Sequence, residues 1–126
     1  MSETEKITLN LGAVDLGQID LLVEQGFYTN RTDLIRTGIR NQINLHAHEI
    51  KQMTQQKAIT IGVQVLTNDH LESLLKQDQK LNLKVVGMLI VEPSVSIDLF
   101  RKVVETAKVY GIIKADNEIK KEISRH

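Results

Sequence analysis

The chain has 126 residues, of which 41% are hydrophobic, and its 16 basic residues balance 16 acidic ones. No apolar run approaches the roughly 18 residues of a membrane-spanning helix, and the N-terminus lacks the layout of a signal peptide. Cys is absent, which excludes disulfides and thiolate metal sites and suits a cytoplasmic protein. Overall charge gives no support for nucleic-acid binding, so any function must be argued from local patterns.

Residues 6–11, KITLNL, alternate between polar and apolar side chains. The apolar members are Ile7, Leu9 and Leu11, and the polar members are Lys6, Thr8 and Asn10. This period of two predicts a half-buried strand. The next forty or so residues predict helices, so the strand has no partner in its own half of the chain. A row of unpaired backbone groups is unfavourable, and the strand therefore requires a partner from elsewhere.

Two helices are predicted after this strand. Asp15 followed by Gln18 resembles a capping box and predicts a short helix over residues 15–25. Gly26 is placed as the stop of that helix.

The second predicted helix runs from about residue 31 to about residue 54. Asn30 is a suitable N-cap, and Asp33 lies in the first turn, where a negative charge suits the helix dipole. The polar stretch KQMTQQK (51–57) then indicates a domain boundary, which divides the chain into residues 1–54 and 55–126.

The second half predicts a small α/β domain with the order β-α-β-α-β-α. The strand over 83–91 is a nearly continuous apolar run, as expected of a central strand that is buried on both faces. Gly62 and Gly87 interrupt strand patterns, where glycine marks a bulge or close packing. The elements expected are a strand over 59–65, a short helix capped by Thr67 or Asn68, the strand over 83–91, a helix over 95–109, a short strand over 111–115 and a helix from Asp116.

A second copy of the chain supplies the missing strand partner. Two copies of residues 6–11, related by a two-fold axis, would form an antiparallel ribbon with its apolar side on the helices and its polar side outside. The major groove of B-DNA admits such a ribbon, and Lys, Thr and Asn can all bond to base edges there. The pattern predicts base contacts by Lys6, Thr8 and Asn10 at a roughly palindromic site.

The start of the second predicted helix offers a contact to phosphate. The free backbone N–H groups of Asn30, Arg31 and Thr32, together with the helix dipole, form a natural anion-binding position. Arg31 adds a positive charge at the same place.

The remaining charges of the first half leave alternatives open. Residues 1–53 carry five basic and seven acidic residues. This mild negative charge does not refute DNA binding, because phosphate contacts depend on the charges at the contact face. Arg36 and Arg40 suit phosphate contacts and structural ion pairs equally, for example with Asp33 or Asp20.

The stretch from residue 5 to about residue 45 resembles the ribbon-helix-helix family of DNA-binding proteins, which includes the Arc, CopG and methionine repressors and the ParD-type antitoxins. The combination of the alternating strand with GFYTNRTDLIR, Gly26 to Arg36, carries the resemblance. It implies an obligate dimer, with bases contacted by the ribbon and phosphates by the start of the second helix. Gly38 departs from the family pattern, in which Ala is usual. The dimer core is expected to contain Ile7, Leu9, Leu11, Leu34, Ile35 and Ile39.

No metal site or catalytic set is predicted. The nickel-responsive repressor, which joins a ribbon-helix-helix to an α/β domain, would require a Cys and several His, but Cys is absent and only two His follow residue 54. His46 and His48 point about 200° apart on a helix and do not suit one ion. His46 is expected to be a packed or interface residue and His48 to be solvated. No phosphate-binding glycine loop is present.

We therefore expect an α+β protein that is not an enzyme and needs no cofactor. Its expected function is that of a sequence-specific transcriptional regulator, a repressor, whose partners are double-stranded DNA and a second copy, as a dimer or a tetramer. The alternative is an assembly module or antitoxin in which the ribbon only dimerises. The second domain could bind a small effector, drive assembly or bind another protein, and its regular pattern favours sensing or assembly.

Overall fold

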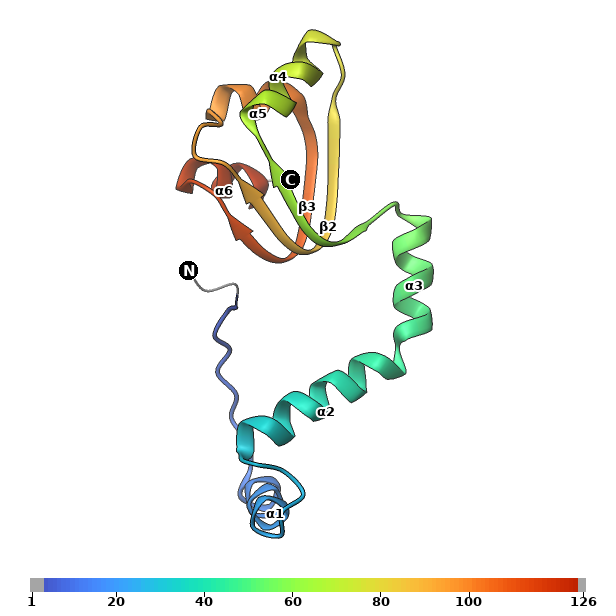
Figure 1. Cartoon of the computed structure of the whole chain (residues 1–126), viewed down its shortest axis with the longest axis vertical. Helices are drawn as coiled ribbons and strands as arrows, with labels where there is room; N and C mark the ends of the chain where they lie inside the picture. The colour runs from blue at the N-terminus through green and yellow to red at the C-terminus, as the bar shows by residue number, and fades with distance from the viewer. Residues whose placement is uncertain (1–3, 125–126) are drawn as a thin grey trace. The chain divides into compact units, whose positions relative to one another are not determined.

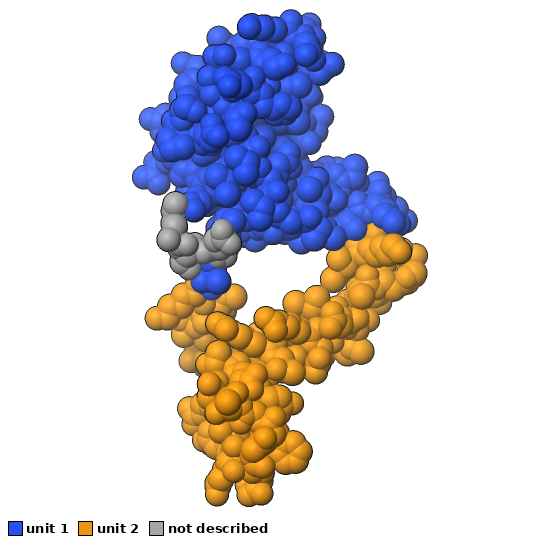
Figure 2. Space-filling view, in the orientation of Figure 1, with its two compact units in different colours: residues 1–5, 53–126 blue, residues 6–52 orange. Residues whose placement is uncertain are grey.

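The computed structural model describes residues 4–124 and contains both helices and strands (Figure 1). Residues 6–52 form one compact unit, and residues 53–126 together with residues 1–5 form another (Figure 2). The elements in chain order are α1 (Ala13–Glu24), α2 (Arg31–Leu45), α3 (Ala47–Gln56), β1 (Thr60–Leu66), α4 (Asn68–Lys76), β2 (Leu81–Val91), α5 (Ile97–Val103), β3 (Val104–Lys114) and α6 (Asn117–Ser124).

Helix α1 begins earlier than predicted. Its N-cap is Gly12, and the carbonyl of Gly12 accepts the N–H of Leu16 at 3.1 Å. The prediction of Asp15 as the cap was wrong, because the turn had already formed at Gly12. Asp15 lies instead in the first helical turn, where its charge faces the positive end of the dipole.

Gly26 ends α1, as predicted. Its φ is +86°, a left-handed conformation that glycine adopts without steric cost. The N–H of Gly26 donates to the carbonyl of Val23 at 3.1 Å, and that of Phe27 donates to Leu22 at 3.0 Å. These two bonds form a Schellman motif, which satisfies carbonyl groups at the end of the helix.

The single helix predicted from about 31 to 54 is two helices, and that prediction was wrong. The N–H of His46 donates to the carbonyl of Ile43, only three residues back, at 2.9 Å. The regular four-residue bonding is therefore interrupted at His46, which is the C-cap of α2. Neither Gly nor Pro marks this break, so the sequence carries no signal for it.

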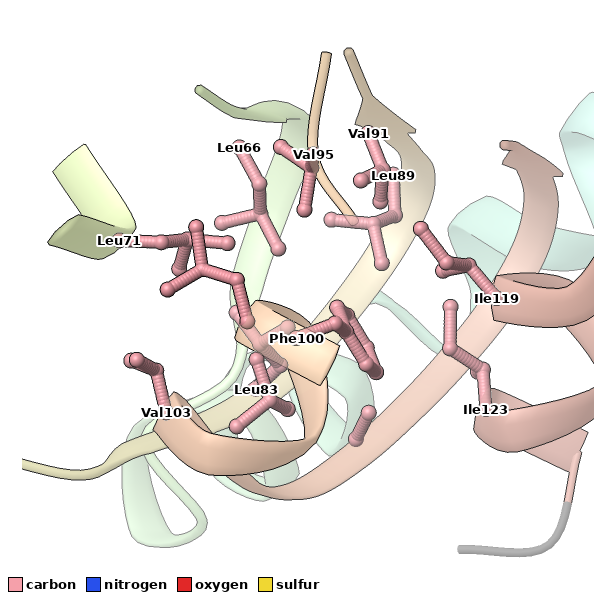
Figure 3. Close-up of a cluster of buried hydrophobic side chains, with 13 residues drawn as sticks. Leu66, Leu71, Leu83, Leu89, Val91, Val95, Phe100, Val103, Ile119 and Ile123 are labelled. Atoms are coloured by element: carbon pink, nitrogen blue, oxygen red, sulfur yellow. The ribbon is translucent and has the colours of Figure 1, made fainter. Parts of the chain in front are cut away.

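The second unit contains a three-stranded parallel sheet with β2 in the centre, in the order β1-β2-β3. Helices α4, α5 and α6 cover one face of it (Figure 1). Figure 3 shows their side chains interlocking with those of the strands around Phe100, which is fully buried. The core is otherwise aliphatic, and its buried members are Leu66, Leu71, Leu83, Leu89, Val91, Val95, Leu99, Phe100, Val103, Val104, Ala107, Ile119 and Ile123.

The helix predicted over 95–109 is shorter than expected. It ends at Val103, and β3 begins at once with Val104. Val103 and Ala107 are four residues apart, so they would share one face of a helix and also one face of a strand. Periodicity therefore could not separate helix from strand here. Pairing with β2 makes residues 104–109 a strand, and the register of that pairing shifts between Leu81, which faces Val104, and Asn82, which faces Thr106.

The expectation that the central strand is buried on both faces holds only in part. Leu83, Leu89 and Val91 are in the core. On the opposite face Met88 is buried and Val86 and Ile90 are half-buried, whereas Lys84 is exposed. All three helices lie on the same side of the sheet, and within residues 4–124 no helix packs on the other side.

Three glycines, Gly62, Gly87 and Gly111, lie side by side across the sheet. Their φ angles are +129°, +136° and +129°, which other residues rarely adopt. A Cβ atom on Gly87 would clash with the carbonyl oxygen of Gly62, and one on Gly111 with that of Gly87. The close packing predicted from the strand glycines is confirmed, and Gly111 lies inside β3 rather than at the start of a strand.

Candidate nucleic-acid interface

The polar residues predicted to contact bases are on the surface. Lys6, Thr8 and Asn10 are all exposed in a segment, residues 4–12, that has no regular secondary structure. The predicted strand is not formed within one chain, which provides it with no neighbouring strand. Its pairing with a second copy stays a prediction.

The apolar side of the same segment is uncovered. Ile7 is 84% exposed and Leu9 is 60% exposed, whereas Leu11 is half-buried against the rest of the chain. Leaving such side chains in water forgoes the roughly 1.5–3 kcal/mol that full burial of each would contribute. The apolar side chains of this segment therefore contribute to stability only if another surface covers them.

Helices α1 and α2 likewise lack a core of their own. Within residues 6–52, Ile19 is the single buried hydrophobic residue. Of the predicted dimer-core residues on α2, Leu34 and Ile35 are half-buried and Ile39 is 52% exposed. A segment this short with one buried side chain cannot offset the entropy of folding alone. Further exposed apolar side chains of this unit are Val14, Leu21, Phe27, Ile43 and Leu45.

The start of α2 has the geometry of an anion-binding position. The side chain of Asn30 accepts the N–H of Asp33 at 2.8 Å, which confirms Asn30 as the N-cap. The N–H groups of Asn30, Arg31 and Thr32 belong to the first turn and have no intrahelical acceptor. They lie at the positive end of the helix dipole, where a phosphate oxygen could accept their hydrogen bonds.

The turn before α2 is held by the carboxylate of Asp33. Its Oδ2 accepts the backbone N–H of Thr29 at 3.0 Å and the Thr29 hydroxyl at 2.8 Å. The backbone bond first, and the hydroxyl bond second, lower the pKa of Asp33 below its ordinary value. Asp33 therefore stays ionised and fixes the conformation in which α2 presents its N-terminus.

Arg31 is not a free cation in this chain. Its Nε and terminal nitrogen donate to the two carboxylate oxygens of Asp20 at 2.7 and 2.8 Å, a bidentate pair between α2 and α1. The hydrogen bonds lower the pKa of Asp20 and raise that of Arg31. The ion pairs considered for Arg36 and Arg40 with Asp20 or Asp33 are not formed, because those carboxylates bond to Arg31 and Thr29.

Three features of residues 6–45 agree with a single family of proteins. They are an unpaired alternating segment, two short helices with an exposed apolar side, and an N-cap on the second helix. The model of a ribbon-helix-helix transcriptional regulator family matches residues 2–120. The chain belongs to this family. Neither a curated protein nor a solved structure matches it.

The match of this ribbon-helix-helix chain extends far beyond residues 5–45, over which sequence motifs carried the resemblance. It includes the whole three-stranded sheet, helices α4 and α5 and the start of α6, for which the sequence carries no family motif. The α/β unit is therefore part of the family pattern, and the family is one of regulators rather than enzymes.

His46 and His48, at the junction of α2 and α3, both lie on the surface of this chain. The side chain of His46 is 60% exposed, and its Nδ1 lies 3.9 Å from Oε1 of Glu49. In one chain His46 is therefore solvated rather than packed, as is His48. Among the described residues, no group of three or more His, Cys, Asp or Glu could hold a metal ion. None of the helices within residues 4–124 is long and apolar enough to cross a membrane.

The ion pair between Asp20 and Arg31 was not predicted from the sequence. Asp20 and Arg31 are 11 residues apart, a separation that corresponds to no helix or strand period, so their pairing depends on how α1 packs against α2. The sequence shows only that Asp20 is one of three acidic residues of α1, together with Asp15 and Glu24, and that several arginines follow it, so it favours no single pair.

Proposed function

We propose that this protein is a sequence-specific DNA-binding repressor of transcription. Residues 6–11 of two copies pair as an antiparallel ribbon, and its polar side enters the major groove, where Lys6, Thr8 and Asn10 contact base edges. The N-terminus of α2 binds phosphate on each flank through the backbone N–H groups of Asn30, Arg31 and Thr32, while the Arg31 side chain stays paired with Asp20.

One observation carries this proposal: the unit of residues 6–52 buries only Ile19, and it exposes the apolar side of an alternating segment. In a family of ribbon-helix-helix regulators, the economical way to cover that side is a second copy. Covering it leaves the polar side outward on a two-stranded ribbon, with two-fold symmetry that matches a palindromic operator.

The two units have separate roles in this proposal. We assign DNA binding and dimerisation to residues 1–54, and sensing or assembly to residues 55–126, with no cofactor required. The rival function, an assembly module or antitoxin, would use the same ribbon only to hold two chains together. It predicts no preference among DNA sequences.

Selection from a random-sequence duplex library with the full-length protein tests the proposal. We expect enrichment of a palindromic motif at moderate salt, and a shift of DNA from the protein's own promoter. Enrichment without a shared motif, or no binding at all, would contradict sequence-specific regulation and favour the rival.

The Asp20–Arg31 pair yields a separate prediction. Asp20→Asn removes the carboxylate that holds Arg31, so the guanidinium becomes free to contact phosphate. We expect the logarithm of DNA affinity to fall more steeply with the logarithm of salt concentration, by about two per dimer, because one phosphate contact is added per chain. Fluorescence anisotropy over a salt series measures this slope.

Asp15→Asn is the matched control for that measurement, because it removes one exposed carboxylate from the same helix without releasing an arginine. If both variants show the slope of the wild type, Arg31 does not compete between Asp20 and phosphate.

A further inference from the structure

The uncovered face of the parallel sheet is an apolar surface in its own right. Strand register places its side chains in three rows, one across each level of β1, β2 and β3. The rows are Ile61–Val86–Tyr110, Val63–Met88–Ile112 and Val65–Ile90–Lys114. Alternation along each strand directs these side chains away from the core residues Leu66, Leu89 and Val91. We call these three rows the open face.

The most exposed side chains of the open face lie on the edge strands β1 and β3. Ile61 is 61%, Val63 59% and Tyr110 50% exposed, whereas Met88 in the centre is 7% exposed because its neighbours surround it. Parallel sheets occur almost only with both faces covered. This sheet therefore lacks a layer that its own described residues do not supply.

Lysines limit the open face at both ends. Lys84 and Lys108 are paired across β2 and β3 in the row before Val86 and Tyr110, and Lys114 closes the last row. The Lys108 ammonium lies 5.4 Å from the centre of the Tyr110 ring, so its stem extends along the apolar rows. Lysine stems can lie along apolar surface while the ammonium group stays in water, so these lysines bound the open face without interrupting its apolar rows.

The exposed side chains of the open face suit one partner. Four large side chains that line it, Ile61, Val63, Val65 and Tyr110, are 48–61% exposed, and contiguous exposed apolar surface of this kind marks an interaction site. A contact made by three short rows of side chains is small, and a small contact suffices when the partners are already linked, because linkage supplies a millimolar effective concentration. A second copy of this chain is linked in this way by the ribbon, so this step rests on the proposed function.

We propose that the open face packs against the open face of a second copy, as a two-sheet sandwich. Sheets stack face to face about 10 Å apart, and an isologous contact buries the same rows from both chains. Val63, Met88 and Ile112 form the middle row and lie nearest the two-fold axis. The C-terminal unit is then an assembly domain that adds a second contact to the one made by the ribbon.

Single cysteines test this pairing, because the native chain has none. Val63→Cys, Met88→Cys and Ile112→Cys are made one at a time in the full-length protein, and Lys120→Cys on α6, an exposed residue in the helical layer, is the matched control. Each variant is oxidised under native conditions and run on a non-reducing gel, and maleimide labelling reports how accessible each thiol is. Circular dichroism confirms that each variant is folded.

We expect at least one middle-row variant to form a disulfide-linked dimer readily, while Lys120→Cys remains mostly monomeric. Middle-row thiols that label freely and do not cross-link would show that the face is open, and would overturn the proposal. Thiols that are protected from maleimide but do not cross-link would also overturn it, since another part of the chain would cover the face.

Leu9→Cys separates this inference from the proposed function. Cross-linking at Leu9 without cross-linking in the middle row would leave the ribbon intact and reject the sandwich. Cross-linking in the middle row alone would establish the sandwich and reject the ribbon.

Discussion

Replacing Lys6, Thr8 and Asn10 together with Ala is expected to abolish operator-specific binding and to leave the dimer intact. The three side chains are exposed and alternate with the apolar residues that would pack inward, so their removal does not touch the dimer core. Each good base contact contributes about 1–3 kcal/mol of discrimination, and a dimer makes each contact twice. We therefore expect affinity for the operator to fall about 1,000-fold or more, to the level of unrelated DNA.

The measurement compares fluorescence anisotropy on the selected operator and on a scrambled duplex, with molecular mass from light scattering. Ala at Gln55, Gln56 and Lys57 is the matched control, because it removes the same single charge from exposed polar positions outside the ribbon. Retained operator binding by the ribbon variant would show that this side does not read bases. A loss of dimer mass would show that the polar residues are structural.

Gly87→Ala and Gly111→Ala are expected to unfold the C-terminal unit, whereas Gly62→Ala should only weaken it. All three glycines have a strongly positive φ, which costs an L-residue about 1–3 kcal/mol. At Gly87 and Gly111 the new methyl group would also collide with a backbone carbonyl of the neighbouring strand, which cannot move without breaking the ladder. The combined penalty should exceed about 4 kcal/mol, a large part of the stability of a small domain.

Gly62 lies on the edge strand, where a Cβ atom meets no heavy atom within 4 Å, so it isolates the cost of strain from the cost of the clash. Thermal unfolding by circular dichroism gives the order of stability, and amide NMR spectra show which unit has lost its structure. Equal effects at Gly62 and Gly87 would mean that strain alone explains the glycine row.

Local signals predicted a good part of this fold. The Asn30 cap, the Gly26 stop and the Thr67 cap, whose hydroxyl accepts the N–H of His70, all act within one helical turn and are visible in the chain. Glycines in strand patterns indicated close packing, which the structure shows at Gly87. These features depend on a few adjacent residues, so the sequence contains all the information they need.

Other features depend on distant residues and were missed. Whether residues 104–109 form helix or strand is decided by the ladder to β2, because the buried positions Val104 and Ala107 fit both periods. The pair between Asp20 and Arg31 requires α1 and α2 to be packed together. The break between α2 and α3 at His46 could not be predicted, because no glycine or proline lies beside it.

The sequence by itself determined the family, through an alternating strand followed by a capped helix, because those patterns arise from backbone geometry and local hydrogen bonding. It also indicated that residues 6–11 lack a partner in their own half of the chain. Only the tertiary structure decided that helices cover one side of the three-stranded sheet, since which face receives the helices depends on the packing of all three strands. The same packing placed three glycines in one row, where strand register alone brings their backbones into contact.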